Sequence, residues 1–132
     1  MADRPVCELM RVLPSSVLPD EGAAPALQRM RSEGVALLPV LDYGELLGLV
    51  YERDLARLRG ELLGRRLVRD VMRGDPPVAP PWRSVDAVLR LMLTHRSEAV
   101  VISDRGHLVG LFTLDDAARR CGALLDAAAL RH

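Results

Sequence analysis

The amino-acid sequence repeats itself at an offset of 62 residues, and this repeat limits the possible fold more than any other feature. Met10-Arg11 recurs as Met72-Arg73, and Asp54 recurs as Asp116. Further matches pair Pro14 with Pro76, Pro19 with Pro81, Leu27 with Leu89, Met30 with Met92, Gly44 with Gly106 and Gly48 with Gly110. The position of Pro39 suggests a slip of one residue between positions 33 and 43. The chain is therefore two copies of one unit, residues 1–64 and 65–132. Because about 60 residues bury too little surface alone, we expect the copies to pack together as one module.

Each copy predicts the same order of elements. In the second copy, a proline-rich extended segment (76–81) precedes a helix that Ser84 caps. Two apolar runs around Asp104-Arg105-Gly106 predict a β-hairpin, and a closing helix begins near Leu114. The corresponding features of the first copy are the segment 14–19, the turn Asp42-Tyr43-Gly44 and a helix from Glu52. The helix faces that we expect to be buried are Val85, Val88, Leu89 and Met92 in the second copy, and Ala23, Ala26, Leu27 and Met30 in the first.

Charge and composition exclude several classes of function. The 18 basic and 18 acidic residues balance, which disfavours a nucleic-acid partner. No apolar run approaches the length of about 20 residues that a membrane helix needs. Cys7 and Cys121 lie far apart, no Cys or His has metal-ligand spacing, and no nucleophile–base or acid pair is evident. We therefore expect a cytoplasmic protein with reduced thiols and no enzymatic activity, metal or membrane anchor.

The doubled order of elements resembles the tandem pair of cystathionine-β-synthase (CBS) domains called a Bateman module. Three segments carry the resemblance: Val-Arg-Asp-Val-Met at 68–72, echoed at 6–10; Ala-Leu-Leu-Pro-Val-Leu-Asp at 36–42; and Gly-Leu-Phe-Thr-Leu-Asp-Asp at 110–116. The resemblance implies a mixed α/β (α+β) fold in which two β-α-β-β-α motifs, related by a pseudo-two-fold axis, pack sheet to sheet. It also implies a stand-alone bacterial form whose regulated target is a separate chain.

The junction from Gly110 to Asp116 is the main candidate for a binding site. Gly110 leaves room for another backbone or a planar ligand. Thr113 lies where a strand gives way to a helix, whose start favours a phosphate. By resemblance, the Thr113 hydroxyl contacts the phosphate and Asp116 accepts from the ribose hydroxyls. The alternative is structural, because Thr-x-x-Asp is also a capping box.

The rest of the predicted site follows from the resemblance and from the repeat. The adenine is expected against Pro76, Pro77, Ala99 and Val101, which are otherwise core residues. The equivalent site of the first copy comprises Asp54, Tyr51, Pro14, Ser15, Leu37 and Leu38. Because Tyr51 replaces the expected Ser or Thr, that site is either empty or holds a ligand without a phosphate there, and we favour one competent site. The candidate phosphate partners are Arg53, His95, Arg96 and His107.

These observations predict a regulatory module that binds an adenine nucleotide (AMP, ADP, ATP or S-adenosylmethionine) in the cleft between the motifs and modulates a separate protein. No cofactor is required beyond this regulatory ligand. The Ala- and Leu-rich stretch from Ala117 to Leu130 offers more apolar surface than one helix face needs, which favours a homodimer, although it could instead be buried within the monomer. The alternative function is a ligand-free module for dimerisation or protein interaction.

Overall fold

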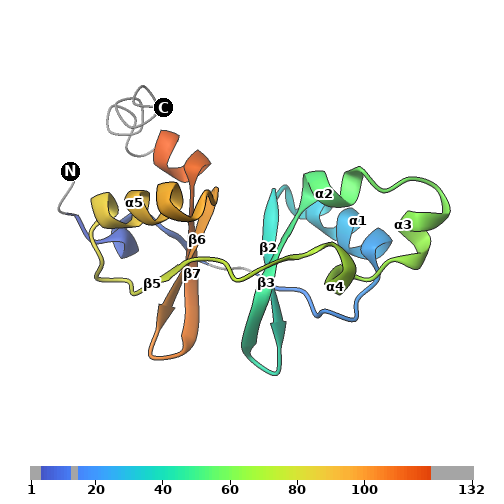
Figure 1. Cartoon of the computed structure of the whole chain (residues 1–132), viewed down its shortest axis with the longest axis horizontal. Coiled ribbons are helices and arrows are strands. Elements are labelled where there is room, and N and C mark those ends of the chain that lie inside the picture. Colours follow the sequence, from blue (N-terminus) through green and yellow to red (C-terminus); the bar gives the residue numbers. More distant parts are fainter. Residues whose placement is uncertain (1–3, 13–14, 120–132) are drawn as a thin grey trace. The chain divides into compact units, whose positions relative to one another are not determined.

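The computed structural model describes residues 4–12 and 15–119, which form two compact units. One unit combines residues 4–12 with residues 76–119, and the other consists of residues 15–75. Both contain helices and an antiparallel hairpin (Figure 1). The predicted mixed α+β fold class is therefore confirmed, while the packing of one unit on the other stays a prediction.

The unit of residues 15–75 is a three-stranded antiparallel sheet covered by short helices. Its elements are α1 (Ala23–Glu33), β2 (Leu37–Asp42), β3 (Glu45–Tyr51), α2 (Glu52–Ala56), α3 (Glu61–Arg65), α4 (Val68–Val71) and β4 (Arg73–Gly74). The strand order is β2-β3-β4. The proline-rich segment contributes a single parallel bridge between Val17 and Val40 in place of a strand, because proline has no amide to donate to a strand ladder.

The other unit has a four-stranded sheet with the order β1-β7-β6-β5. Its elements are η1 (Val6–Glu8), β1 (Arg11–Val12), β5 (Val78–Ala79), α5 (Val85–His95), β6 (Ala99–Asp104) and β7 (His107–Thr113), followed by helical residues 114–119. β5 runs parallel to β6, and the other pairs are antiparallel. The predicted β-α-β-β-α order of the second copy is confirmed.

Both hairpins have the tight turn that their sequences predict. Tyr43 and Gly44 have φ values of 51° and 80°, and Arg105 and Gly106 have 53° and 83°. Two successive positive φ values are typical of the type I′ turn, which suits the twist of a hairpin. The strand registers place Gly48 opposite Val40 and Gly110 opposite Ile102, with a bulge directly after each pair. The offset of 62 therefore holds through both hairpins, and the suggested slip of one residue is wrong.

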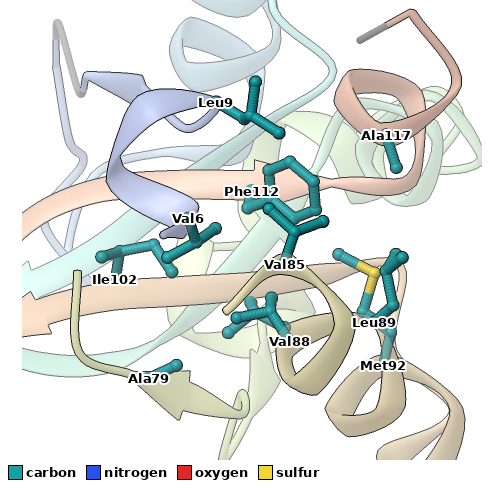
Figure 2. Close-up of a cluster of buried hydrophobic side chains, with 11 residues drawn as sticks. Val6, Leu9, Ala79, Val85, Val88, Leu89, Met92, Ile102, Phe112 and Ala117 are labelled. Atoms are coloured by element: carbon teal, nitrogen blue, oxygen red, sulfur yellow. The ribbon is translucent and has the colours of Figure 1, made fainter. Parts of the chain in front are cut away.

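The two cores are mainly aliphatic, with the aromatic Phe112 in one of them, and both predicted helix faces are buried in them. The Ser84 hydroxyl accepts the Ala87 amide at 3.2 Å, which confirms the predicted N-cap of α5. Figure 2 shows Val6 and Leu9, from the start of the chain, beside Phe112 and Val85. These contacts between distant parts of the sequence belong to a single core.

The division at residues 64 and 65 separates the two sequence repeats, whereas the compact units divide the chain at other positions. β1 pairs with β7 of the second copy, and β4 pairs with β3 of the first. The Val6 amide donates to the Arg83 carbonyl at 2.8 Å, which fixes the opening segment of the first copy (η1 and β1) beside α5 (Figure 1). The opening segment of each copy thus forms part of the compact unit that holds the hairpin of the other copy. This exchange gives the edges of β3 and β7 a strand partner.

Candidate functional site

The candidate site lies at the end of β7, where the strand passes into helical residues 114–119. The Asp116 amide donates to Thr113 Oγ1 at 3.0 Å, and the Thr113 amide donates to Asp116 Oδ2 at 3.1 Å. This reciprocal pair is a capping box that satisfies two amides at the helix start. The structural alternative for Thr-x-x-Asp is therefore present. A hydroxyl that accepts one such bond can still donate its own proton to a ligand.

The Asp116 carboxylate is buried and already paired. Its side chain is 1% exposed, and Oδ1 accepts from an Arg11 nitrogen at 3.0 Å and from an Arg119 nitrogen at 3.2 Å. Burial of a carboxylate is costly unless charged partners compensate for the lost water, and the two guanidinium groups do so. Both carboxylate oxygens of Asp116 thus have partners within the protein.

The apolar residues predicted for the second site are brought to the same end of the sheet. Ala99 is the strand partner of Thr113, and the Val101 amide donates to the Pro77 carbonyl at 2.9 Å. Ala99, Val101 and Pro77 are buried, whereas Pro76 is partly exposed. The structure therefore gathers Thr113, Ala99, Val101 and Pro77 around one strand end.

Gly110 makes room for protein rather than for a ligand. A Cβ atom at this position would lie 2.6 Å from the Met10 sulfur and 2.8 Å from the Arg11 carbonyl oxygen. Of the two alternatives for this glycine, close approach of another backbone is the one observed. Gly48 is equivalent, since its Cβ would lie 2.4 Å from the Arg73 carbonyl oxygen.

The junction of the first copy is closed by side chains of its own compact unit. Arg73 donates through two nitrogens to the two Asp54 carboxylate oxygens, at 2.8 and 3.1 Å. The guanidinium carbons of Arg73 and Arg53 lie 4.5 and 4.8 Å from the centre of the Tyr51 ring, which is itself 4% exposed. The hydrogen bond from Arg73 lowers the pKa of Asp54 below 3.8 against the opposing effect of burial, and the charges of Arg73, Arg53 and Arg57 act in the same direction.

The remaining residues predicted for the first site have structural partners. The Ser15 hydroxyl donates to a Glu33 carboxylate oxygen at 2.9 Å. Leu38 belongs to the buried core, and Leu37 lies opposite Tyr51 in the hairpin. Pro14 lies outside the described residues. Tyr51 makes no side-chain hydrogen bond that caps α2.

The basic residues at the two junctions are mostly not those that the sequence suggested. His95, Arg96 and His107 are exposed, and Arg53 contacts the Tyr51 ring. Arg11 and Arg73, which reach Asp116 and Asp54, were missed as site residues. A signal for them existed, because each Arg and each Asp is matched in the other copy at the same offset of 62.

The CBS domain family model matches this chain twice, over residues 6–61 and 68–122. The chain therefore belongs to the CBS domain family, and a tandem CBS pair is a regulatory module. The two matches coincide with the two sequence repeats, although the compact units exchange their opening segments.

Known relatives of this chain differ in how much of their length it spans. The inosine-5′-monophosphate dehydrogenase of Korarchaeum cryptofilum is 31% identical over 102 residues, which are 76% of this chain and 21% of that protein. The CBS domain-containing protein YhcV of Bacillus subtilis is 30% identical over 116 residues, which are 86% of this chain and 82% of YhcV. A solved structure of CBSX2 in complex with AMP has a TM-score of 0.75 and 26% identity, and covers 92% of this chain and 98% of that one.

Within residues 4–12 and 15–119, no helix combines the length and the apolar character needed to cross a membrane. Most of the Ala- and Leu-rich stretch expected at a dimer interface, from residue 120 onward, lies outside the described residues. Of its first residues, Ala117 is buried and Ala118 is exposed.

Proposed function

We propose that this CBS pair is a sensor that binds one adenine nucleotide per chain at the strand end that carries Thr113 and Asp116. The proposal rests on one observation. The Thr113 hydroxyl, the Asp116 carboxylate and the Arg11 guanidinium lie together at this point, beside buried apolar residues. These groups complement the phosphate, sugar hydroxyls and base of a nucleotide. The complex of CBSX2 with AMP supports the same class of ligand.

Each group has a separate role in the proposal. The Thr113 hydroxyl donates to a phosphate oxygen, and Asp116 accepts from the ribose hydroxyls. Ala99, Val101, Pro76 and Pro77 supply apolar surface and backbone groups for the adenine. The junction of Tyr51 and Asp54 holds no phosphate, because a tyrosine ring replaces the hydroxyl that Thr113 offers at the start of the helix in the second copy.

The proposal is tested by calorimetric titration with AMP, ADP, ATP and S-adenosylmethionine. Asp116→Ala should weaken nucleotide binding by about 1–3 kcal/mol, because it removes the charge-assisted bonds to the ribose. Since Asp116 also caps a helix, thermal unfolding of the variant must show that it is folded. Asp54→Ala is the matched variant in the first copy and should leave nucleotide affinity unchanged. Equal affinity of wild type and a folded Asp116→Ala would contradict the role of Asp116.

Regulation of a partner belongs to the same proposal. A bound nucleotide changes the affinity for a second protein only if it favours one of two arrangements of the module. We propose a homodimer in the cytoplasm, where the nucleotide pool is, with a separate protein as the regulated target. The dimer is tested by sedimentation equilibrium with and without AMP.

The second candidate function is a ligand-free interaction module. It is favoured by one observation: both junction carboxylates, Asp54 and Asp116, are already paired with arginines of their own compact unit. Mass spectrometry of the purified protein separates the two candidates. A protein that retains no nucleotide, binds none in titration and forms a stable dimer would favour the interaction module.

A further inference from the structure

Arg11 reaches the candidate site from the exchanged opening segment. Its backbone pairs with Leu111 in the sheet, and its side chain extends to Asp116 Oδ1 at 3.0 Å. The Arg11 side chain is 41% exposed, whereas that of Asp116 is 1% exposed. Asp116 is thus an enclosed carboxylate whose two arginine partners both reach solvent, since the Arg119 side chain is 57% exposed.

The equivalent ion pair in the other compact unit, between Arg73 and Asp54, is held more firmly. Arg73 binds Asp54 with two nitrogens and lies over the Tyr51 ring, whereas Arg11 binds Asp116 with one nitrogen. Thr113 stands where Tyr51 stands in the first copy and offers no ring to hold a guanidinium. Bidentate and ring-stacked arginines are fixed in orientation. Arg11 is half-exposed and makes a single bond, so it can give up its place at Asp116 when other donors take over that bond and Arg119 stays bound.

Charge balance determines what can replace Arg11. Arg119 also contacts Asp115, at 2.9 Å, so Arg119 and Asp115 form one ion pair and Arg11 is the counter-ion of Asp116. If neutral ribose hydroxyls take over Asp116 Oδ1, the guanidinium of Arg11 loses its partner. A negative charge on the ligand restores the balance, a neutral ligand leaves it unbalanced, and a positive ligand worsens it.

We propose that Arg11 is an exchangeable partner of Asp116 that makes the site select anionic adenosine nucleotides. On binding, the ribose hydroxyls replace Arg11 at Asp116 Oδ1, and Arg11 turns to the phosphate. AMP therefore binds more tightly than adenosine, and the cationic S-adenosylmethionine binds weakly. This inference rests on the proposed function, since it assumes that Asp116 receives the ribose.

The test compares AMP, adenosine and S-adenosylmethionine by calorimetry on wild type and Arg11→Met, which keeps an unbranched, flexible side chain and removes the charged guanidinium. In Arg11→Met, AMP affinity falls by about 10-fold or more, the loss expected for one charge-assisted contact. Adenosine affinity stays equal or rises, because no guanidinium has to be displaced. Salt weakens binding of AMP to wild type and has little effect on adenosine.

Two further variants complete the design. Arg11→Lys keeps the charge and retains the preference for AMP, so it remains informative if Arg11→Met unfolds. Arg73→Met is the matched change in the other unit, and it lowers stability without changing the ratio of AMP to adenosine affinity. If AMP binds wild type but the ratio is the same in folded Arg11→Met, or is lost in folded Arg11→Lys, the role of Arg11 is wrong while the proposed function stands. If wild type binds none of AMP, ADP, ATP, adenosine and S-adenosylmethionine, both are wrong.

Discussion

Gly48 illustrates how the exchange of opening segments requires a glycine at one position of the sequence. Its missing side chain lets β4 approach β3, and an added Cβ would meet the Arg73 carbonyl oxygen at 2.4 Å. A backbone atom cannot move aside as the end of a flexible side chain can. The equivalent Gly110 meets both the flexible Met10 sulfur and the Arg11 carbonyl oxygen.

We therefore predict that Gly48→Ala lowers the free energy of unfolding by about 1–3 kcal/mol, the usual cost of overpacking. Gly64, inside α3, is the control, because nothing lies within 4 Å of its added Cβ and its φ is not positive. Gly64→Ala should be neutral or stabilising by up to about 1 kcal/mol, since alanine favours a helix. Urea denaturation measures both variants. Equal effects would contradict the close approach of β4 to β3.

The ion pair of Asp54 and Arg73 predicts a dependence of stability on pH. Because the pKa of folded Asp54 lies below its usual 3.8, the pair stabilises the protein above that pH and the stabilisation is lost as the pH falls through the folded pKa. The groups that act on Asp54 are Arg73 from β4, and Arg53 and Arg57 in and directly after α2.

Asp54→Asn should thus destabilise the protein by about 1–3 kcal/mol at pH 7, as expected for lost charge-assisted bonds. The difference between wild type and variant should shrink below about pH 4, where the unfolded carboxyl takes up its proton. Urea denaturation between pH 2 and 7 measures it. A difference that stays constant over this range would show that the charge of Asp54 is not responsible.

Among the helices and strands, the features that the sequence predicted correctly are those that depend on residues close together in the chain. The hairpin turns follow from Gly44 and Gly106. The predicted cap at Ser84 and the buried faces of α1 and α5 also depend on residues within a few positions of one another.

The exchange of opening segments was not predictable in this way. Residues 6–10 and 68–72 are alike, so each fits either copy, and which sheet edge it joins depends on contacts far away in the sequence. For the same reason, Thr113 and Asp116 were predicted as site residues but Arg11 was not, since its partner is 105 residues away. The capping box was foreseen as an alternative because its two residues are only three positions apart in the sequence.

The start of α5 gives a prediction for a single element. Ser84→Ala should lower the free energy of unfolding by about 1 kcal/mol, because the Ala87 amide loses its acceptor. Ser84→Asn keeps a capping oxygen and should remain close to wild type. Thermal unfolding followed by circular dichroism measures both. Equal loss in the two variants would show that the cap is not what stabilises this helix end.

For the whole molecule, the compact units predict where the chain can be divided. A fragment of residues 14–75 contains both α4 and β4, and Val68 of α4 is buried in the core of that unit. A fragment of residues 1–64 follows the sequence repeat but lacks both elements. We predict that fragment 14–75 unfolds more cooperatively in urea and has more far-ultraviolet ellipticity than fragment 1–64. Indistinguishable behaviour would show that the opening segment of the second copy is dispensable for the first.

The exchanged segments also set an order of events during translation. Residues 15–75 are contiguous, so their unit can close as soon as they leave the ribosome. Arg11 emerges early, yet its strand partner Leu111 is made 100 residues later. At about 5–20 residues per second, the first strand waits for at least about 5 seconds. During translation the N-terminal part of a chain usually folds first. Here the unit that holds the N-terminal strand and the Thr113 junction is the last to be completed.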